Sequence, residues 1–490
     1  MDLSRAILAH LPATIARPRF DAAKVSRGIV HLGFGGFHRA HMARYTHDLM
    51  ERRGDAAQWG IVGVGLLPVD LRVHDALAPQ DALYTLVERQ DGDETATVIG
   101  SACEVIFAGE SSQAALEAID DPSIRIVSLT VTENGYCRNA ATRTLDRDHP
   151  FIVHDLGHPD KPRSAIGILV EAYRRRMASG APAFTALTCD NIQHNGVVLR
   201  DAVLALAGWR DPELAEWIAA NATFPSTMVD RITPVTTPAQ IEDFTARFGL
   251  VDRWPIFCER FRQWVIEGNF VAGRPAWEEV GAQFVADVAP YEFMKLRLLN
   301  ASHLAIAGLG RLMGYVYIDE TIRDPSLRSY MRALMDRETG PTLPAVPGVD
   351  LEGYKTQLIE RFGNVAIKDT VDRVNADAPI NLLLEPIRDR LAVGASVDLL
   401  ALALAAGMRR ATGVDEAGNP ISVVHPLADL LRERALAGGP DPLPLLSIRK
   451  LFGDLSDHGA FVATLKAWLT SLYADGAAAT LASARRMLSF

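Results

Sequence analysis

Four polar residues that could carry acid–base chemistry lie close together near the middle of the chain. The string YEFMKLRLLNASH, residues 291–303, contains Glu292, Lys295, Asn300 and His303. On one α-helix, where each residue advances about 100°, these side chains fall within an arc of about 140°. A lysine with a lowered pKa can act as a general base, and amide or imidazole N–H groups can stabilise an oxyanion. Oxidation of a secondary alcohol needs both, although the pattern alone fits a solvated helix face equally well.

A glycine cluster, GFGGFH, lies near the beginning of the chain at residues 33–38. A predicted strand at 28–32 precedes it, and a helical pattern follows. In a dinucleotide-binding fold this turn brings backbone N–H groups against a pyrophosphate, and glycine permits the close approach. We therefore predict a cofactor site here and regard a purely structural turn as the alternative. The residues expected at this site are Gly33, Gly35, Gly36, Phe37 and His38.

Two neighbouring features of this region are ambiguous. Asp70 follows the second predicted strand and could bind the adenine ribose, but it lies later than the usual offset of ~20 residues, so a solvated loop acid is equally compatible. His38 and His41 are spaced as neighbours on a helix face. No Cys, Asp or Glu nearby completes a ligand set, so we expect no metal site.

The elements that would position these groups divide the chain into two parts. The first alternates short apolar runs with helical patterns, with strands predicted at 28–32, 59–64, 84–87, 125–131 and 184–188. This alternation predicts an α/β, Rossmann-type doubly wound parallel sheet. Long helical patterns dominate after about residue 290, at 292–312, 326–336, 351–362, 397–411 and 457–473. We predict a dinucleotide-binding domain over 1–285 and a mostly helical substrate-binding domain over 286–490.

Composition limits the classes of function. The chain has 490 residues, 48% of them hydrophobic, and a formal net charge of −10, which disfavours nucleic-acid or membrane partners. The longest apolar run, residues 399–408, is about half a membrane span and is predicted to be a buried helix. The four cysteines show no zinc-type or disulfide spacing, as expected of a cytoplasmic protein. A monomer and a weak homodimer are both compatible with the sequence.

Several motifs give the chain a strong resemblance to the polyol-specific long-chain dehydrogenases, the family of mannitol 2-dehydrogenase. The shared strings are the K-x4-N-x2-H pattern from Lys295, GFGGFHRAH at 33–41, TVTENGY at 130–136, CDN-x3-NG at 189–196 and the FP…MVDRI stretch at 224–232. Further matches continue in order toward the C-terminus. The resemblance therefore covers nearly the whole chain.

The resemblance implies a role for each matching residue. Lys295 would be the general base of a metal-independent hydride transfer, Asn191 and Asn300 would polarise the reacting oxygen, and His303 would orient the substrate. Glu292 would lie near a solvent path to the lysine. The remaining residues implied by it are Asp230 and Arg373 at the substrate, and Asp70, Thr132, Glu133 and Asp190 at the cofactor.

By the same resemblance the cofactor is NAD, with Asp70 as the acid that selects it. Relatives often carry a second acid where this chain has Val69, so NADP remains an alternative. After Arg373 the family usually has a lysine that contacts substrate hydroxyls, and this chain has none through Leu382. We therefore expect a mannitol/fructose-like reaction, with fructuronate (sugar-acid) reduction or an arabinitol- or sorbitol-type reaction as alternatives.

Overall fold

The computed structural model describes residues 1–139 and 142–490. The chain forms two compact units, Met1–Ala289 and Pro290–Phe490, named unit 1 and unit 2 below. The division falls just after the boundary expected from the change in sequence pattern.

Unit 1 contains a five-stranded parallel sheet with the strand order β6-β3-β2-β7-β8. The strands are β2 (Arg27–Leu32), β3 (Gly60–Gly65), β6 (Ala102–Phe107), β7 (Ile126–Leu129) and β8 (Thr185–Thr188). Numbered in chain order, the sheet reads 3-2-1-4-5, which is the Rossmann order without its sixth strand. The order reverses between β2 and β7, so ligands are expected beyond the carboxyl ends of these two strands.

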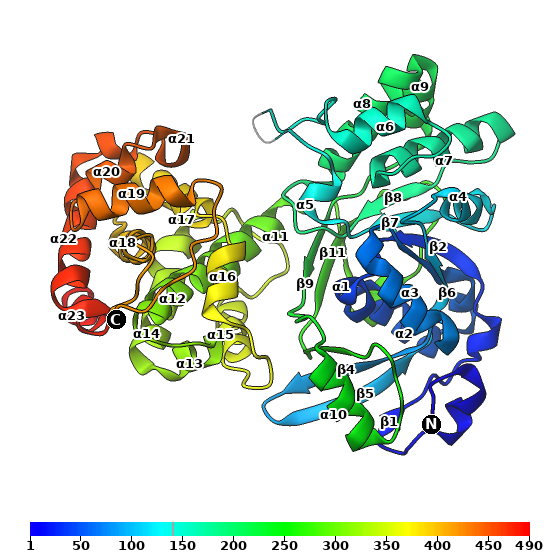
Figure 1. Cartoon of the computed structure of the whole chain (residues 1–490), viewed down its shortest axis with the longest axis horizontal. Helices are drawn as coiled ribbons and strands as arrows, with labels where there is room; N and C mark the ends of the chain where they lie inside the picture. The colour runs from blue at the N-terminus through cyan, green and yellow to red at the C-terminus, as the bar shows by residue number, and fades with distance from the viewer. Residues whose placement is uncertain (140–141) are drawn as a thin grey trace. The chain divides into compact units, whose positions relative to one another are not determined.

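The two faces of this sheet bury different cores because successive side chains alternate along a strand. Val30 and Leu32 face a core shared with α4 (Gln113–Asp120), α7 (Ala165–Ser179) and α8 (Asn195–Arg210). Ile29 faces the opposite core, which includes residues of α2 (Met42–Arg52). Figure 1 shows the sheet in unit 1 with α7 and α8 lying over it. The sheet is thus covered on both faces, as the apolar strand runs predict.

The strand predicted at 84–87 is present, but its expected place in the Rossmann sheet is wrong. Tyr84–Gln90 does form a buried strand, β4, but it belongs to a second sheet of order β1-β5-β4-β10, where it pairs antiparallel with β5. The third Rossmann strand is β6, in which Cys103 and Glu104 interrupt the apolar run and hid it from a search for such runs. The remaining strands are β1 (Ile15–Ala16), β5 (Asp93–Ile99), β10 (Ile256–Glu259), and a third sheet of β9 (Thr227–Asp230), β11 (Gln263–Glu267) and β12 (Gln283–Val285).

The helix predicted after the glycine turn is two helices. α1 (Gly36–Ala40) ends just before His41, whose φ of −113° and ψ of −91° are not helical, and α2 begins at Met42. The other helices of unit 1 are α3 (Leu71–Leu77), α5 (Thr132–Gly135), α6 (Pro150–Gly157), α9 (Pro212–Asn221) and α10 (Pro238–Phe248).

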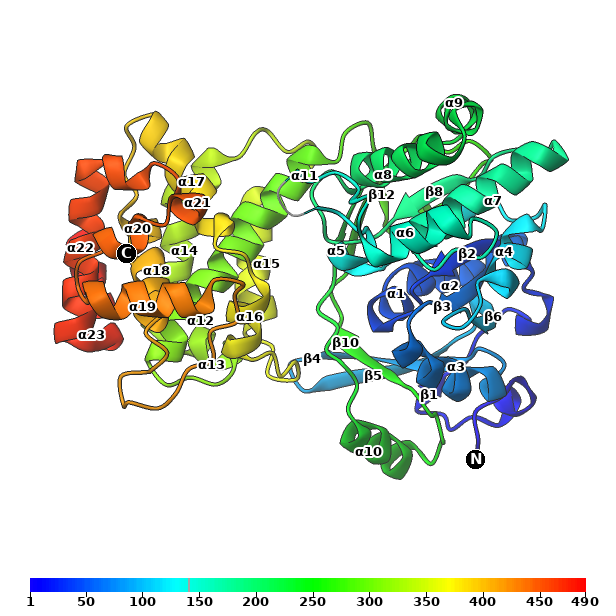
Figure 2. The same cartoon turned by 45° about the horizontal axis from the view of Figure 1, so that its top comes forward.

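Unit 2 is mostly helical, as predicted. Its helices are α11 (Ala289–Met294, which begins at the last residue of unit 1), α12 (Ala301–Leu312), α13 (Ile318–Arg323), α14 (Pro325–Leu334), α15 (Leu351–Phe362), α16 (Val371–Asp377), α17 (Asn381–Ala392), α18 (Asp398–Arg410), α19 (Ala428–Gly438), α20 (Leu443–Leu446), α21 (Arg449–Phe452), α22 (Gly459–Ala474) and α23 (Gly476–Leu488). α18 packs between α12 and α22 (Figure 2). Its apolar run is buried, so the expected buried helix is confirmed. Among the described residues, no helix combines the length and apolarity that a membrane span requires.

Candidate functional site

The turn after β2 requires glycine at its first position. Gly33 has a φ of +88°, and a Cβ there would lie 2.1 Å from the carbonyl oxygen of Thr130. The Gly33 N–H donates to the carbonyl of Val64 at 2.8 Å, and the Thr130 hydroxyl donates to the Gly33 carbonyl at 2.8 Å. These contacts fix the turn against the end of β7, on the other side of the switch point.

Gly35 and Gly36 are glycine for a different reason. A Cβ on Gly35 would meet only the Gly33 carbonyl at 3.8 Å, and one on Gly36 would meet side chains no closer than 3.7 Å. Neither residue has a positive φ. The protein itself therefore leaves room for side chains at these two positions. A ligand that approaches the backbone closely accounts for glycine there, so the turn fits the expected pyrophosphate site.

The histidine side chains of the motif, including His38, which we predicted at the cofactor, are buried within unit 1. His38 is 1% exposed and stacks on His31 with ring centroids 3.4 Å apart, while Nε2–H of His41 donates to the Gln263 carbonyl at 2.8 Å. Burial lowers the pKa of His38 well below its usual value and that of His41 to about 3. The break at His41 also means that the two rings do not share a regular helix face. Phe37 stacks on the His41 ring.

Asp70 lies at the end of β3 despite its late position in the sequence. The short helical turn Pro68–Asp70 folds it back, so that a Cβ on Gly65 would lie 2.7 Å from the Asp70 Cβ. Its Oδ2 accepts the N–H groups of Leu66 and Leu67 at 3.0 and 2.9 Å. The carboxylate thus occupies the strand end where a Rossmann fold binds the ribose.

The turn after β7 is held by Asp190, which lies just beyond β8. Asp190 accepts N–H groups from Val131 at 3.1 Å and Thr132 at 2.8 Å, and the Tyr136 hydroxyl at 2.9 Å. Burial raises the pKa of Asp190, and these donors oppose that shift. Glu133 follows Thr132 in α5 and is exposed. Asn191, also exposed, directly follows Asp190.

In unit 2, the lysine segment is not a regular α-helix. Residues Lys295–Asn300 form a π-helical turn between α11 and α12, so the angles expected from an α-helix were wrong here. In a π turn, residues i and i+5 are bonded neighbours, and this spacing separates Lys295 from Asn300. His303 lies one α-helical step of three residues further on. The π turn therefore aligns the three side chains on one side of the helix more closely than an α-helix would. Such turns often occur at functional sites.

His303 is held by two contacts that the sequence did not reveal. Its ring stacks on Phe362 with centroids 4.2 Å apart, and its Nε2 lies 3.7 Å from Oδ2 of Asp369. Asp369 also accepts hydrogen bonds from Nε and Nη2 of Arg373. Arg373 reaches Asp377 as well, at 3.0 Å. In the sequence, only the i,i+4 spacing of Asp369, Arg373 and Asp377 indicates that these three residues form ion pairs.

Three other predicted residues are buried. Glu292, on α11, is 6% exposed, and Lys295 is 8% exposed. Asp230 ends β9 and is 5% exposed. No group of three His, Cys, Asp or Glu side chains within 1–139 and 142–490 is arranged to hold a metal ion.

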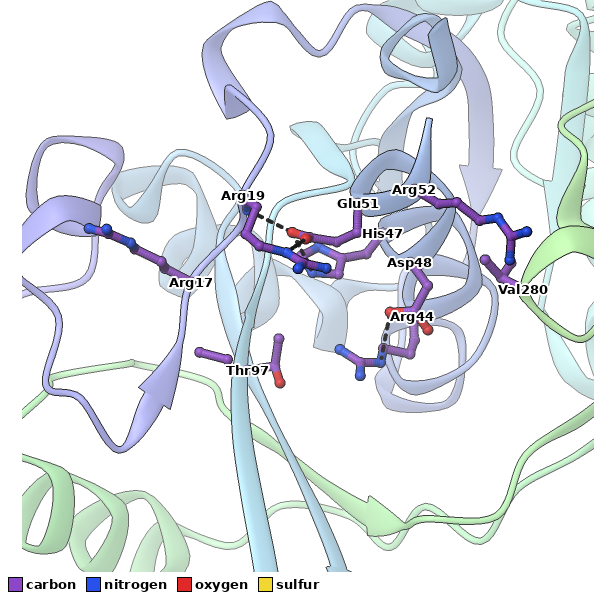
Figure 3. Close-up of a pocket in the computed structure, with 10 residues that line it drawn as sticks. Arg17, Arg19, Arg44, His47, Asp48, Glu51, Arg52, Thr97 and Val280 are labelled. Carbon is purple, nitrogen blue, oxygen red and sulfur yellow. Dashed lines mark hydrogen bonds and ion pairs between the residues drawn. The ribbon is translucent and has the colours of Figure 1, made fainter. Parts of the chain in front are cut away.

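A cavity of about 530 Å³ in unit 1 was not predicted (Figure 3). It is lined by Ala16, Arg17, Arg19, Arg44, His47, Asp48, Glu51, Arg52, Thr97 and Val280. Arg19 forms an ion pair with Glu51, and Arg44 lies 3.5 Å from Asp48. Carboxylates of the cavity wall therefore neutralise two of its four arginines, and we assign these pairs a structural role.

A Rossmann sheet with an open glycine turn at its switch point, in a chain that also carries an aligned lysine, asparagine and histidine, defines a dinucleotide-dependent oxidoreductase. The family models agree. Residues 27–279 match the mannitol dehydrogenase Rossmann domain, and residues 287–473 match the mannitol dehydrogenase C-terminal domain. The chain belongs to the mannitol dehydrogenase family.

Similar proteins extend over almost the whole chain. D-mannonate oxidoreductase of Escherichia coli is 46% identical over 94% of this chain and 96% of its own. Mannitol 2-dehydrogenase of Aspergillus fumigatus is 42% identical over 96% and 95%. The solved Pseudomonas fluorescens mannitol 2-dehydrogenase, in a ternary complex with NAD and D-mannitol, is 41% identical, with a TM-score of 0.88 and full coverage of both chains.

Proposed function

We propose that this chain catalyses the NAD-dependent interconversion of a sugar alcohol and its ketose by metal-independent hydride transfer. The observation that carries the proposal is the π turn, which aligns Lys295, Asn300 and His303. NAD, when bound, supplies the acceptor for the hydride that leaves the carbinol carbon. The neutral Lys295 amine takes the hydroxyl proton of the same carbon, so a carbonyl is formed.

The other residues bind and orient. Asn300 donates an amide N–H to the substrate oxygen as negative charge develops there, and the resemblance assigns Asn191 the same task. His303, fixed by Phe362 and Asp369, orients the substrate hydroxyl groups. We propose that Gly35 and Gly36 admit the pyrophosphate.

We propose that Asp70 binds the adenine ribose, which would favour NAD because a carboxylate repels the extra phosphate of NADP. Thr132 and Glu133, at the turn after β7, complete the proposed cofactor contacts. We propose that Glu292 lies near a solvent path to the lysine and that Asp230 contacts the substrate.

Replacement of the base tests the proposal. Lys295→Ala should lower kcat by about 10²–10⁴-fold while the affinity for NADH, measured by fluorescence titration, stays unchanged. Lys355→Ala is the matched control, because Lys355 is also buried but pairs with Asp336 and Glu352. It should affect stability and leave kcat near the wild-type value. A Lys295→Ala variant with normal turnover would refute the proposal, and treatment with EDTA should not change the rate.

A sugar acid is the second candidate substrate. The similarity to a D-mannonate oxidoreductase and the missing lysine after Arg373 favour it. The ion pairs of unit 2 favour a neutral polyol instead, because Arg373 already pairs with Asp369 and Asp377. A second cation, Arg297, pairs with Asp389 at 2.8 Å. Values of kcat/KM for mannitol, arabinitol, sorbitol and mannonate, each with NAD and NADP, separate the two substrates and the two cofactors.

A further inference from the structure

The turn after β7 contains a backbone conformation that its residue disfavours. Thr132 has a φ of +61°, in the left-handed region. Eight non-glycine residues of the described chain have a positive φ, and Thr132 is the β-branched one among them. Branching at Cβ makes this conformation unfavourable, so the surrounding structure must impose it. Strain of this kind often occurs where a fold presents backbone groups to a ligand.

The carboxylate of Asp190 bonds the backbone at this residue. Its Oδ2 accepts the N–H of Val131 and its Oδ1 accepts the N–H of Thr132, so one carboxylate bridges two consecutive amides. The Tyr136 hydroxyl donates to Oδ2 and also contacts the Thr188 hydroxyl at 2.6 Å. Asp190 is 6% exposed. Both of its oxygens are thus occupied by the protein.

The backbone of Asp190 links the end of β8 to the beginning of β9 through the side chain of Asn195. Its carbonyl accepts hydrogen bonds from the Asn195 side chain and the Ile192 N–H, both at 2.9 Å. The Asn195 side chain also bonds both the N–H and the carbonyl of Thr227, in β9. Asn191 follows Asp190 directly, so one residue connects the strained turn with the loop that carries Asn191.

We propose that Asp190 is a positioning residue that holds Thr132 in its strained conformation and so shapes the cofactor-binding end of β7, without contacting the cofactor itself. This replaces the expectation from the family resemblance that Asp190 binds the cofactor directly. The turn it holds lies against the glycine turn, since Thr130, the residue after β7, contacts Gly33. The inference rests on the proposed function only in taking NAD as the ligand.

A double-mutant cycle tests the role of the strain. Asp190→Asn puts an amide NH₂ where the carboxylate accepted a backbone N–H, so one donor loses its acceptor and the turn can relax. In the variant, NADH binding must supply the free energy that holds Thr132 in the left-handed conformation. Converted into a ratio of dissociation constants, this cost predicts that the affinity for NADH falls by about 5–30-fold. Glycine adopts a positive φ without strain. In a Thr132→Gly background the same Asp190→Asn change should therefore lower the affinity for NADH by less than about threefold.

Asp155 provides the matched control in the same unit. It is 1% exposed and likewise accepts two backbone N–H groups, from Arg163 and Ser164, and one hydroxyl, from Ser164. Asp155→Asn should lower the thermal stability to a similar extent and leave the affinity for NADH within about twofold of wild type. If it weakens NADH binding as much as Asp190→Asn does, general loosening explains both and the proposal fails.

Two further outcomes decide the question. An Asp190→Asn penalty of equal size in the wild-type and Thr132→Gly backgrounds would mean direct cofactor contact and would overturn the proposal. Hydrogen exchange of the cofactor-free protein gives a readout that does not depend on catalysis. Exchange at Val131 and Thr132 should accelerate in Asp190→Asn, even if no sugar alcohol is a substrate. Should Asp190→Asn not fold, Tyr136→Phe in both backgrounds should show the same coupling at a smaller size.

Discussion

Unit 1 presents backbone groups at its candidate site, whereas unit 2 presents side chains. At the ends of β2 and β7 polar side chains bond the backbone: Asp190 holds two amides, and Thr130 bonds Gly33. In unit 2 the corresponding carboxylates pair with cationic side chains, as Asp369 does with Arg373. The two units therefore require different residue types. The candidate site in unit 1 depends on the backbone conformation of its turns. The candidate site in unit 2 depends on which charged side chains lie beside the helix that carries His303.

The largest effect should come from changing the backbone of unit 1. Gly33→Ala places a Cβ 2.1 Å from the Thr130 carbonyl at a φ of +88°. We expect it to destabilise unit 1 by more than about 4 kcal/mol, because neither clashing backbone segment can move without disrupting the sheet. Gly35→Ala is the matched control, with room for its Cβ. It should fold normally and lose NADH affinity. Equal melting temperatures for the two variants would contradict this distinction.

Acid should shift the stabilities of the two units in opposite directions. Burial lowers the pKa of His31, His41 and His47 to about 3, and raises that of Glu338 to about 7. Below about pH 6.5 the unfolded chain protonates these histidines and the folded unit 1 does not, so unit 1 loses up to about 4 kcal/mol between pH 7 and 5.5. Folded unit 2 instead binds a proton at Glu338 more readily than the unfolded chain, and gains about 1.5 kcal/mol.

Hydrogen exchange followed by mass spectrometry, at pH 7 and 5.5 with correction for the intrinsic rates, resolves the units by peptide. Glu338→Gln should remove the gain in unit 2 and leave unit 1 unaffected. Unit 1 peptides with the same opening free energy at both pH values would show that these histidines are not kept neutral in the folded state.

How much the sequence predicts also differs between the units. In unit 1 the apolar runs locate β2, β3, β7 and β8 because buried parallel strands are continuously apolar. The strand β6 escapes because Cys103 and Glu104 interrupt its apolar pattern. Asp70 looked misplaced because distance along the chain was counted, while the turn at Pro68–Asp70 returns it to the strand end.

In unit 2 the sequence predicts the helices well and their local geometry poorly. The long helices α15 and α18 agree with the predicted ranges to within a residue. The π turn at Lys295–Asn300 was not predictable, because its leucines favour an ordinary α-helix and packing must decide the difference. The partners of His303 could not be predicted either, since Phe362 and Asp369 approach it only through tertiary structure.

A single side chain in unit 2 should affect turnover without affecting cofactor binding. Asn300→Ala removes an amide donor that we propose meets the developing oxyanion, so kcat should fall by about 10²–10³-fold while NADH affinity stays constant. Asn375→Ala is the control. It removes hydrogen bonds from α16 to the Ala307 and Val371 carbonyls and should change kcat by less than about threefold. If both variants lower kcat equally, the loss reflects packing around α12.

The smallest effect concerns substrate choice and the charge beside His303. Asp369→Asn removes the charge of the carboxylate that pairs with Arg373. The exposed Asp377 then remains as the ion-pair partner of Arg373. A cation released in this way attracts a carboxylate and offers nothing extra to a neutral polyol. The ratio of kcat/KM for mannonate to that for mannitol should therefore rise by about tenfold. Asp377→Asn, which removes the weaker, solvent-screened pair, should raise it by less than about threefold. An unchanged ratio in Asp369→Asn would mean that Arg373 does not face the substrate, and that specificity in unit 2 resides in other side chains.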